Sequence, residues 1–177
     1  MSTAKRLTID SADFVRVERH IDGQAPIASF TRLIEDLPEQ ASQGEASMVY
    51  WSLQGYKAPR GESMLRLSVK AAPLVECQRC LGAFHYPIDA ETTLELVKSE
   101  QDLALDVDGS TGEIDHDASE KILASTHLDV LDLVEDELIL CLPYVPTHDI
   151  CPDQVALPED NLEKEASPFA VLEKLKK

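Results

Sequence analysis

The chain has 177 residues, of which 44% are hydrophobic, and this is enough for a single domain with a buried, mostly aliphatic core. Asp and Glu number 33 against 16 Lys and Arg, so the formal net charge is -17. Because nucleic-acid affinity comes mainly from cations that contact phosphates, this charge disfavours nonspecific RNA binding and makes basic proteins the expected partners.

The N-terminal sequence MSTAKRLTIDSADF has no apolar stretch followed by a cleavage site, so it does not predict a signal peptide. No run of eighteen apolar residues predicts a membrane span. We therefore expect a cytoplasmic protein with reduced cysteines and no membrane partner.

The first 40 residues predict one short helix and little other regular structure. Asp22-Gly23 is typical of a turn. Apolar residues at helical spacing then predict a helix over about 27–37, with Pro26 and Pro38 at its ends. These apolar residues are Phe30, Leu33, Ile34 and Leu37.

Residues of about 47–97 predict an antiparallel sheet. Leu65, Leu67 and Val69 alternate with polar residues, which is the pattern of a half-buried strand. Apolar runs flank the CxxC motif of residues 77–80, which predicts a hairpin with the motif at its tip. No connection in this region is long enough for a crossover helix, so we expect a meander.

The segment 95–120 is strongly acidic and is expected to be a solvated loop that contacts a basic partner or only aids solubility. A helix follows over about 127–141, with Thr126 as its predicted cap. Its buried stripe is expected to comprise Leu128, Leu131, Val134, Leu138 and Cys141. Its outer face is expected to present Asp132, Glu135 and Asp136 to a partner.

Together these patterns predict an α+β domain over residues 1–150, in which helices pack on an antiparallel sheet. Residues 151–177 are expected to be a flexible polar tail that ends in a short helix. In this helix Phe169 and Leu172 form an apolar side that suits docking on the chain's own domain or on a partner.

The cysteine motif has three interpretations. Cys77 and Cys80 make half of a tetrahedral zinc site, and His148 with Cys151 offers the other half. A redox CxxC is a second interpretation, disfavoured because the flanking residues resemble strands and not a helix start. Buried, inert thiols are the third, favoured because 67 residues separate Cys80 from His148 and only the fold could unite them.

Arg66, Lys70 and Arg79 lie in the only basic-leaning stretch, which makes them candidates for phosphate contact. An ordinary solvated sheet face explains them better in so acidic a chain. The five His residues occur in no G-x-S-x-G setting, and no phosphate-binding glycine loop or small-molecule site is evident. We therefore expect a protein that is not an enzyme.

Three blocks resemble a known family. VECQRCLGAF (75–84), LDLVEDELILCLPYVPTHD (131–149) and SPFAVLEKLKK (167–177) are similar, in that order, to the YceD family of large ribosomal RNA subunit accumulation proteins. The resemblance extends over most of the chain. Some relatives carry several further cysteines after the second block, whereas this chain has only Cys151, with His148 nearby.

The resemblance implies a role in the synthesis, processing or stability of large-subunit (23S) ribosomal RNA, without an established enzymatic activity. Combined with the charge, it favours an accessory protein of ribosome biogenesis that binds a basic ribosomal protein or assembly factor and affects RNA indirectly. The alternatives are a direct RNA-binding module that uses the basic sheet face, and an enzyme, either a thiol oxidoreductase or a nuclease.

Overall fold

A five-stranded sheet forms the centre of the protein, with the strand order β2-β3-β4-β7-β8. The computed structural model describes residues 7–103 and 120–151. Neighbouring strands are antiparallel, except that β8 runs parallel to β7. The strands are β2 (His20–Pro26), β3 (Met48–Lys57), β4 (Ser63–Ala71), β7 (Ile88–Val97) and β8 (Glu120–Leu123).

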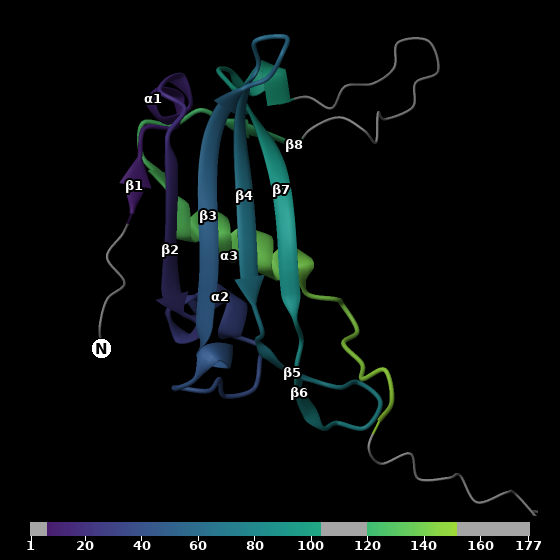
Figure 1. Cartoon of the computed structure of the whole chain (residues 1–177). Helices are drawn as coiled ribbons and strands as arrows, with labels where there is room; N and C mark the ends of the chain where they lie inside the picture. Colours follow the sequence, from purple (N-terminus) through teal and green to yellow (C-terminus); the bar gives the residue numbers. More distant parts are fainter. Residues whose placement is uncertain (1–6, 104–119, 152–177) are drawn as a thin grey trace, which may run out of the picture.

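Two small strand pairs and three helices complete the described parts. Strand β1 (Thr8–Ile9) pairs with β9 (Leu128–Asp129), and β5 (Leu74–Glu76) pairs with β6 (Ala83–His85). The helices are α1 (Ser11–Arg16), α2 (Thr31–Ile34) and α3 (Val130–Cys141), and single 3-10 turns lie at Ile27–Ser29, Glu45–Ser47 and Glu100–Leu103. Figure 1 shows α3 lying across the far face of the sheet, and no described helix covers the near face.

The core lies between α3 and the far face of the sheet. Val130, Val134 and Leu138 follow one another at four-residue spacing along α3, and all three are fully buried. In β4, Leu65, Leu67 and Val69 are fully buried, while Arg66 and Lys70 are exposed. The expected α+β class and the half-buried strand are therefore confirmed.

Strand β8 departs from the expected meander. It pairs with β7 from Leu94↔Glu120 to Val97↔Leu123 in parallel. A parallel neighbour must begin at the same end of the sheet as β7. Residues 98–119, between the two strands, are enough for that return, whereas a hairpin turn is too short. The sequence pattern missed this because the segment's acidity indicated only a loop.

Asp22-Gly23 is not a turn but the middle of β2. Gly23 lies opposite Trp51 on β3, and a Cβ at Gly23 would lie 2.5 Å from the Trp51 ring. The glycine therefore makes room for the indole ring, and its usual association with turns gave a wrong prediction.

Both helices of the core are shorter than predicted. Over 27–37 the chain forms a 3-10 turn and then α2, because Phe30 between them has φ -90 and ψ 83, which is not helical. Helix α3 begins at Val130 and is capped by Asp129, not by Thr126. Pairing of β9 with β1 keeps the backbone extended as far as Asp129, which delays the start of the helix.

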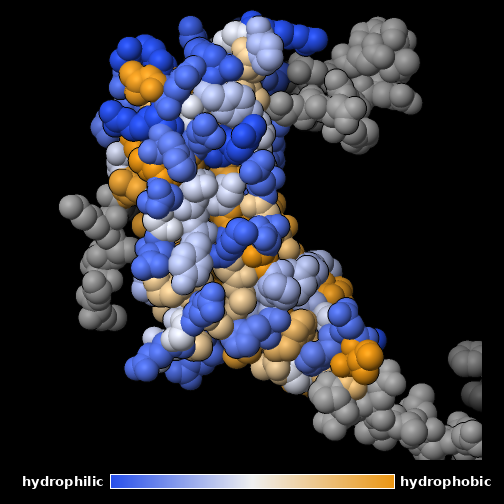
Figure 2. Space-filling model, viewed as in Figure 1, coloured by the Kyte–Doolittle hydropathy of each residue, from blue (hydrophilic) through white to orange (hydrophobic). Residues whose placement is uncertain are grey.

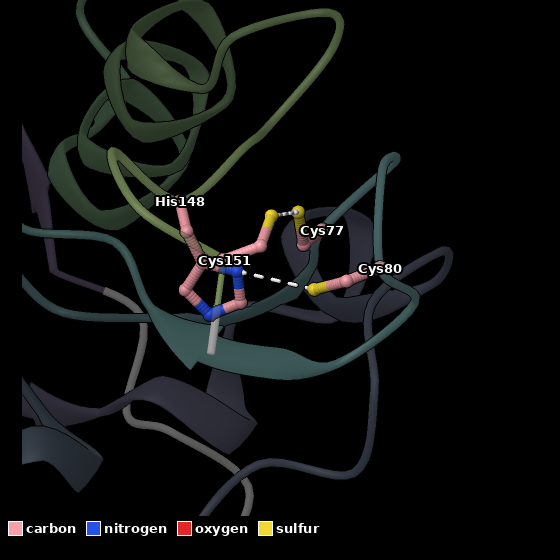
Figure 3. Close-up of side chains that lie close together, drawn as sticks. All are labelled: Cys77, Cys80, His148 and Cys151. Carbon is pink, nitrogen blue, oxygen red and sulfur yellow. Dashed lines mark hydrogen bonds between the residues drawn. The ribbon is translucent and has the colours of Figure 1, made fainter. Parts of the chain in front are cut away.

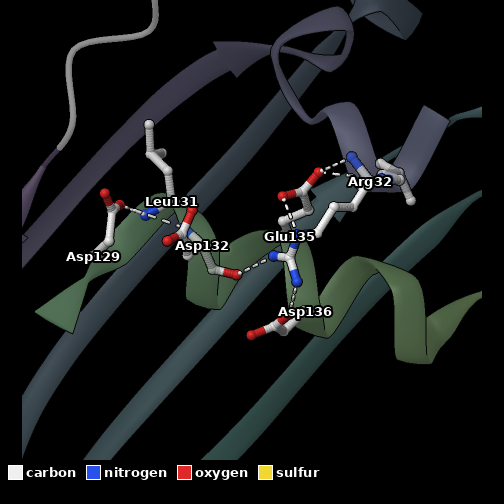
Figure 4. Close-up of polar contacts among 7 residues, drawn as sticks. Arg32, Asp129, Leu131, Asp132, Glu135 and Asp136 are labelled. Carbon is white, nitrogen blue, oxygen red and sulfur yellow. Dashed lines mark hydrogen bonds and ion pairs between the residues drawn. The ribbon is translucent and has the colours of Figure 1, made fainter. Parts of the chain in front are cut away.

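The expected outer face of α3 is wrong at one position. Asp132 and Asp136 are exposed, but Glu135 is only 6% exposed. Its carboxylate is used inside the protein, where α2 packs against α3 (Figure 4).

Some predictions lie outside the described residues. These are most of the acidic loop (104–119) and the tail from residue 152, including Phe169 and Leu172. Within the described ranges, no helix is both long and apolar enough to cross a membrane.

Candidate metal centre

The CxxC motif forms a tight loop at the tip of the β5–β6 hairpin, as predicted. The backbone N–H of Cys77 donates to the carbonyl of Gly82 at 3.0 Å, and the N–H of Leu81 donates to the carbonyl of Cys77 at 2.8 Å. Leu81 has φ 60, in the left-handed region, which turns the chain back into β6. This turn directs both cysteine side chains to the same side of the loop (Figure 3).

The segment that follows α3 brings the other two residues to this loop. Helix α3 ends at Cys141, and the prolines Pro143 and Pro146 prevent its continuation. The N–H of Gln78 donates to the carbonyl of Pro146 at 2.9 Å, and the Arg79 guanidinium donates to the carbonyl of His148. The two segments are thus joined by direct hydrogen bonds beside the cysteines.

Four side chains converge between the hairpin and this segment: Cys77, Cys80, His148 and Cys151 (Figure 3). Their ligand atoms all lie within 4.8 Å of one another. The Sγ atoms of Cys77 and Cys151 are 3.8 Å apart, and Cys80 Sγ is 3.4 Å from His148 Nδ1. The four residues that the sequence suggested as a set are therefore brought together by the fold.

The spacing of these atoms agrees with a tetrahedral metal site. With Zn–S bonds of about 2.3 Å and Zn–N bonds of about 2.0 Å, tetrahedral angles require separations of about 3.8 Å between two sulfurs and about 3.5 Å between sulfur and nitrogen. The two separations above match these values. Three Cys and one His are also a donor set typical of structural zinc.

The pKa values of the two buried thiols, Cys77 and Cys151, are shifted in opposite directions by their surroundings. Burial raises the pKa of Cys77, but hydrogen bonds from the backbone at Cys80, His148 and Arg79 outweigh it and lower the pKa to about 5. Burial and hydrogen bonds with Cys80 and Cys77 raise the pKa of Cys151 to about 11. A bound cation would favour the thiolate form of both cysteines.

Sequence reasoning did not identify the residues that support this cluster. The ring of Phe84 on β6 lies against the His148 ring, with centroids 4.3 Å apart, and so restrains the imidazole. Gln78 and Pro146 contribute through their backbones alone. No sequence pattern could have indicated these contacts, because each joins the hairpin to a segment about 65 residues further along.

The candidate phosphate contacts are separated and largely neutralised. Arg66 and Lys70 lie on the sheet face, where Arg66 pairs with Glu91 (3.6 Å) and Lys70 with Asp89 (3.0 Å). Arg79 lies on the hairpin tip, bonded to His148. The three cations therefore do not form one basic patch.

The fold and this cluster define a small α+β protein with a Cys3His group that joins a hairpin to the end of the core helix. A family model described as "Large ribosomal RNA subunit accumulation protein YceD" matches residues 65–176. A protein of Haemophilus influenzae with the same description is 29% identical over 178 residues, covering 96% of this chain and 95% of that protein. No solved structure matches the chain. The chain belongs to the YceD family.

Proposed function

We propose that this protein is a cytoplasmic accessory factor of ribosome biogenesis that supports the synthesis, processing or stability of large-subunit (23S) ribosomal RNA. It acts by binding a basic ribosomal protein or assembly factor, and its effect on RNA is indirect. Membership of the YceD family carries the first part of this proposal. The net charge of -17 supports the second.

The sheet face supports an indirect role. Direct RNA binding needs cations that are free to replace the counterions of phosphates. Arg66 and Lys70 face carboxylates on β7 instead, and Glu135 and Asp136 hold Arg32 in the same way. Because its cations are paired, this face offers little to offset the repulsion between a polynucleotide and a protein of net charge -17, whereas a basic protein segment would be attracted.

The metal centre has a structural role in this proposal. Cys77 and Cys151 are buried, at 0% and 7% exposure, so their sulfurs are not presented to a substrate. Zinc held by Cys77, Cys80, His148 and Cys151 would fix the segment after α3 against the β5–β6 hairpin. We propose no catalytic role for these residues.

Sedimentation tests the proposal directly. The tagged full-length protein is followed through a sucrose gradient after gentle lysis, beside a deletion strain in which large-subunit RNA is quantified. We expect the protein to travel with large-subunit precursors and not with finished ribosomes, and the deletion to lower 23S RNA. The proposal would be overturned if the tagged protein stays at the top of the gradient and the deletion strain has unchanged 23S RNA.

A further inference from the structure

A groove of about 580 Å³ lies beside the metal centre, between the end of α2 and the segment after α3. Apolar side chains form much of its surface, among them the half-buried Leu37, Pro38 and Leu142. Gln78, inside the CxxC loop, also lines it. The groove thus lies where the hairpin, α2 and the segment after α3 meet.

Three carboxylates also line the groove: Glu35, Asp36 and Glu76. All three are exposed, and none forms an ion pair with another residue in the ranges 7–103 and 120–151. No Lys or Arg from these ranges lines the groove. The groove therefore combines apolar side chains with negative charge that no ion pair within the described residues compensates.

An aromatic side chain projects beside these carboxylates. Tyr144 lines the groove and is fully exposed, although the neighbouring Pro143 and Pro146 are half-buried. Val145 and Ile150 in the same segment are also exposed, at 55% and 81%. Figure 2 shows hydrophobic side chains on the lower right projection of the molecule, where the hairpin end lies in Figure 1. Exposed tyrosines beside an apolar groove are typical of protein-binding surfaces.

We infer that this groove binds a basic segment of a partner protein, in which Lys or Arg lies next to an apolar side chain. The apolar side chain packs against the apolar residues of the groove, and the cation pairs with Glu35, Asp36 or Glu76. The same carboxylates repel RNA phosphates, so the occupant is a protein. The inference rests on the proposed function, because the basic partner proposed there would supply this segment.

Photo-crosslinking from the groove tests this inference. The photoreactive residue p-benzoylphenylalanine replaces Tyr144 in one full-length variant, and Tyr50 on the open sheet face in a matched control. The probe is the total protein of the large ribosomal subunit, freed of RNA. We expect crosslinks from position 144 to map to a segment rich in Lys or Arg, with few from position 50. Equal yields at both positions, crosslinks only within the chain, or no crosslink from position 144 would overturn the inference.

A charge-neutralising variant distinguishes the effect of the groove carboxylates from the effect of the protein's overall charge. The groove variant is Glu35→Gln, Asp36→Asn and Glu76→Gln, and the control removes three exposed charges elsewhere, Asp22→Asn, Glu45→Gln and Glu100→Gln. We expect the yield from position 144 to fall about tenfold in the groove variant only, and to fall with added salt in the parent. Equal losses of crosslinking yield in both variants would show that net charge alone attracts the partner, and this would overturn the inference.

The two proposals fail differently in these experiments. If the groove variant loses its crosslinks but the parent protein still travels with large-subunit precursors, the groove inference and the proposed function both stand. If crosslinks are absent while the parent still travels with precursors, the groove inference alone fails. A parent protein that never associates with precursors overturns the proposed function itself.

Discussion

Arg32 on α2 and Glu135 on α3, 103 residues apart, are joined by two hydrogen bonds, and Leu33 donates a third to the same carboxylate (Figure 4). The Glu135 carboxylate accepts from the Arg32 backbone N–H at 2.7 Å, from Arg32 Nε at 3.0 Å and from the Leu33 N–H at 3.1 Å. Helix α2 has no side-chain cap of its own, and the Glu135 carboxylate, which comes from α3, acts as its N-terminal cap. Arg32 also pairs with Asp136 at 2.7 Å, and its pKa is raised by Asp136 and by Glu135.

Replacing this buried carboxylate should destabilise the fold. Glu135→Ala leaves the N–H groups of Arg32 and Leu33 without an acceptor, and we expect a loss of about 2–4 kcal/mol in the free energy of unfolding. The exposed Asp132→Ala, one turn earlier on α3, should change it by only about 0.5 kcal/mol. Urea unfolding followed by circular dichroism measures both, and similar losses would contradict the assigned role.

Gly55 on β3 allows α1 to lie against the sheet. A Cβ at this position would lie 2.9 Å from Val15 Cα and 3.0 Å from the Phe14 carbonyl oxygen. Because backbone atoms cannot move aside easily, we expect Gly55→Ala to lower the free energy of unfolding by about 1–3 kcal/mol. Gln54→Ala, exposed on the same strand, is the control. Equal thermal stability of the two variants would show that α1 adjusts without cost.

Metal content tests the Cys3His centre. We expect the full-length protein to retain about one zinc ion per chain after dialysis, measured by plasma mass spectrometry. Cys80→Ser and His148→Ala should each lower this content strongly and lower the melting temperature, because the ion links two segments of the fold.

Cys141 provides the matched control for these variants. It lies on α3, outside the cluster, and its thiol contacts Glu137 at 3.7 Å. Burial and the adjacent Glu137 raise its pKa, so it remains a neutral thiol. Cys141→Ala should keep the zinc content of the parent. A loss of zinc from this variant, or none from Cys80→Ser, would contradict the assignment.

Neutralising the sheet cations should leave the function intact. We expect Arg66→Gln combined with Lys70→Gln to keep the parent's position in the sucrose gradient, because both cations already face carboxylates on β7. Circular dichroism confirms that the variant is folded. A folded variant that leaves the precursor fractions would favour direct RNA binding by this face.

Local patterns predicted the elements whose residues interact mainly with near neighbours in the sequence. The alternation of Leu65, Leu67 and Val69 indicated β4, and the apolar runs around the CxxC motif indicated the β5–β6 hairpin. Where a distant residue decided the conformation, the patterns failed. Gly23 was predicted to lie in a turn, but it lies in a strand opposite Trp51. Asp129 caps α3 because pairing with β1 keeps β9 extended up to this residue.

The sequence alone determined the composition, the charge of -17, the two halves of the candidate metal site and the resemblance to the YceD family. Only the tertiary structure decided whether the halves meet, because a separation of 67 residues leaves their distance to the packing of α3 against the sheet. It also decided that Glu135 is buried and that the carboxylates of residues 35, 36 and 76 share one groove. Composition and spacing are properties of the chain, whereas burial and proximity arise only when distant segments pack together.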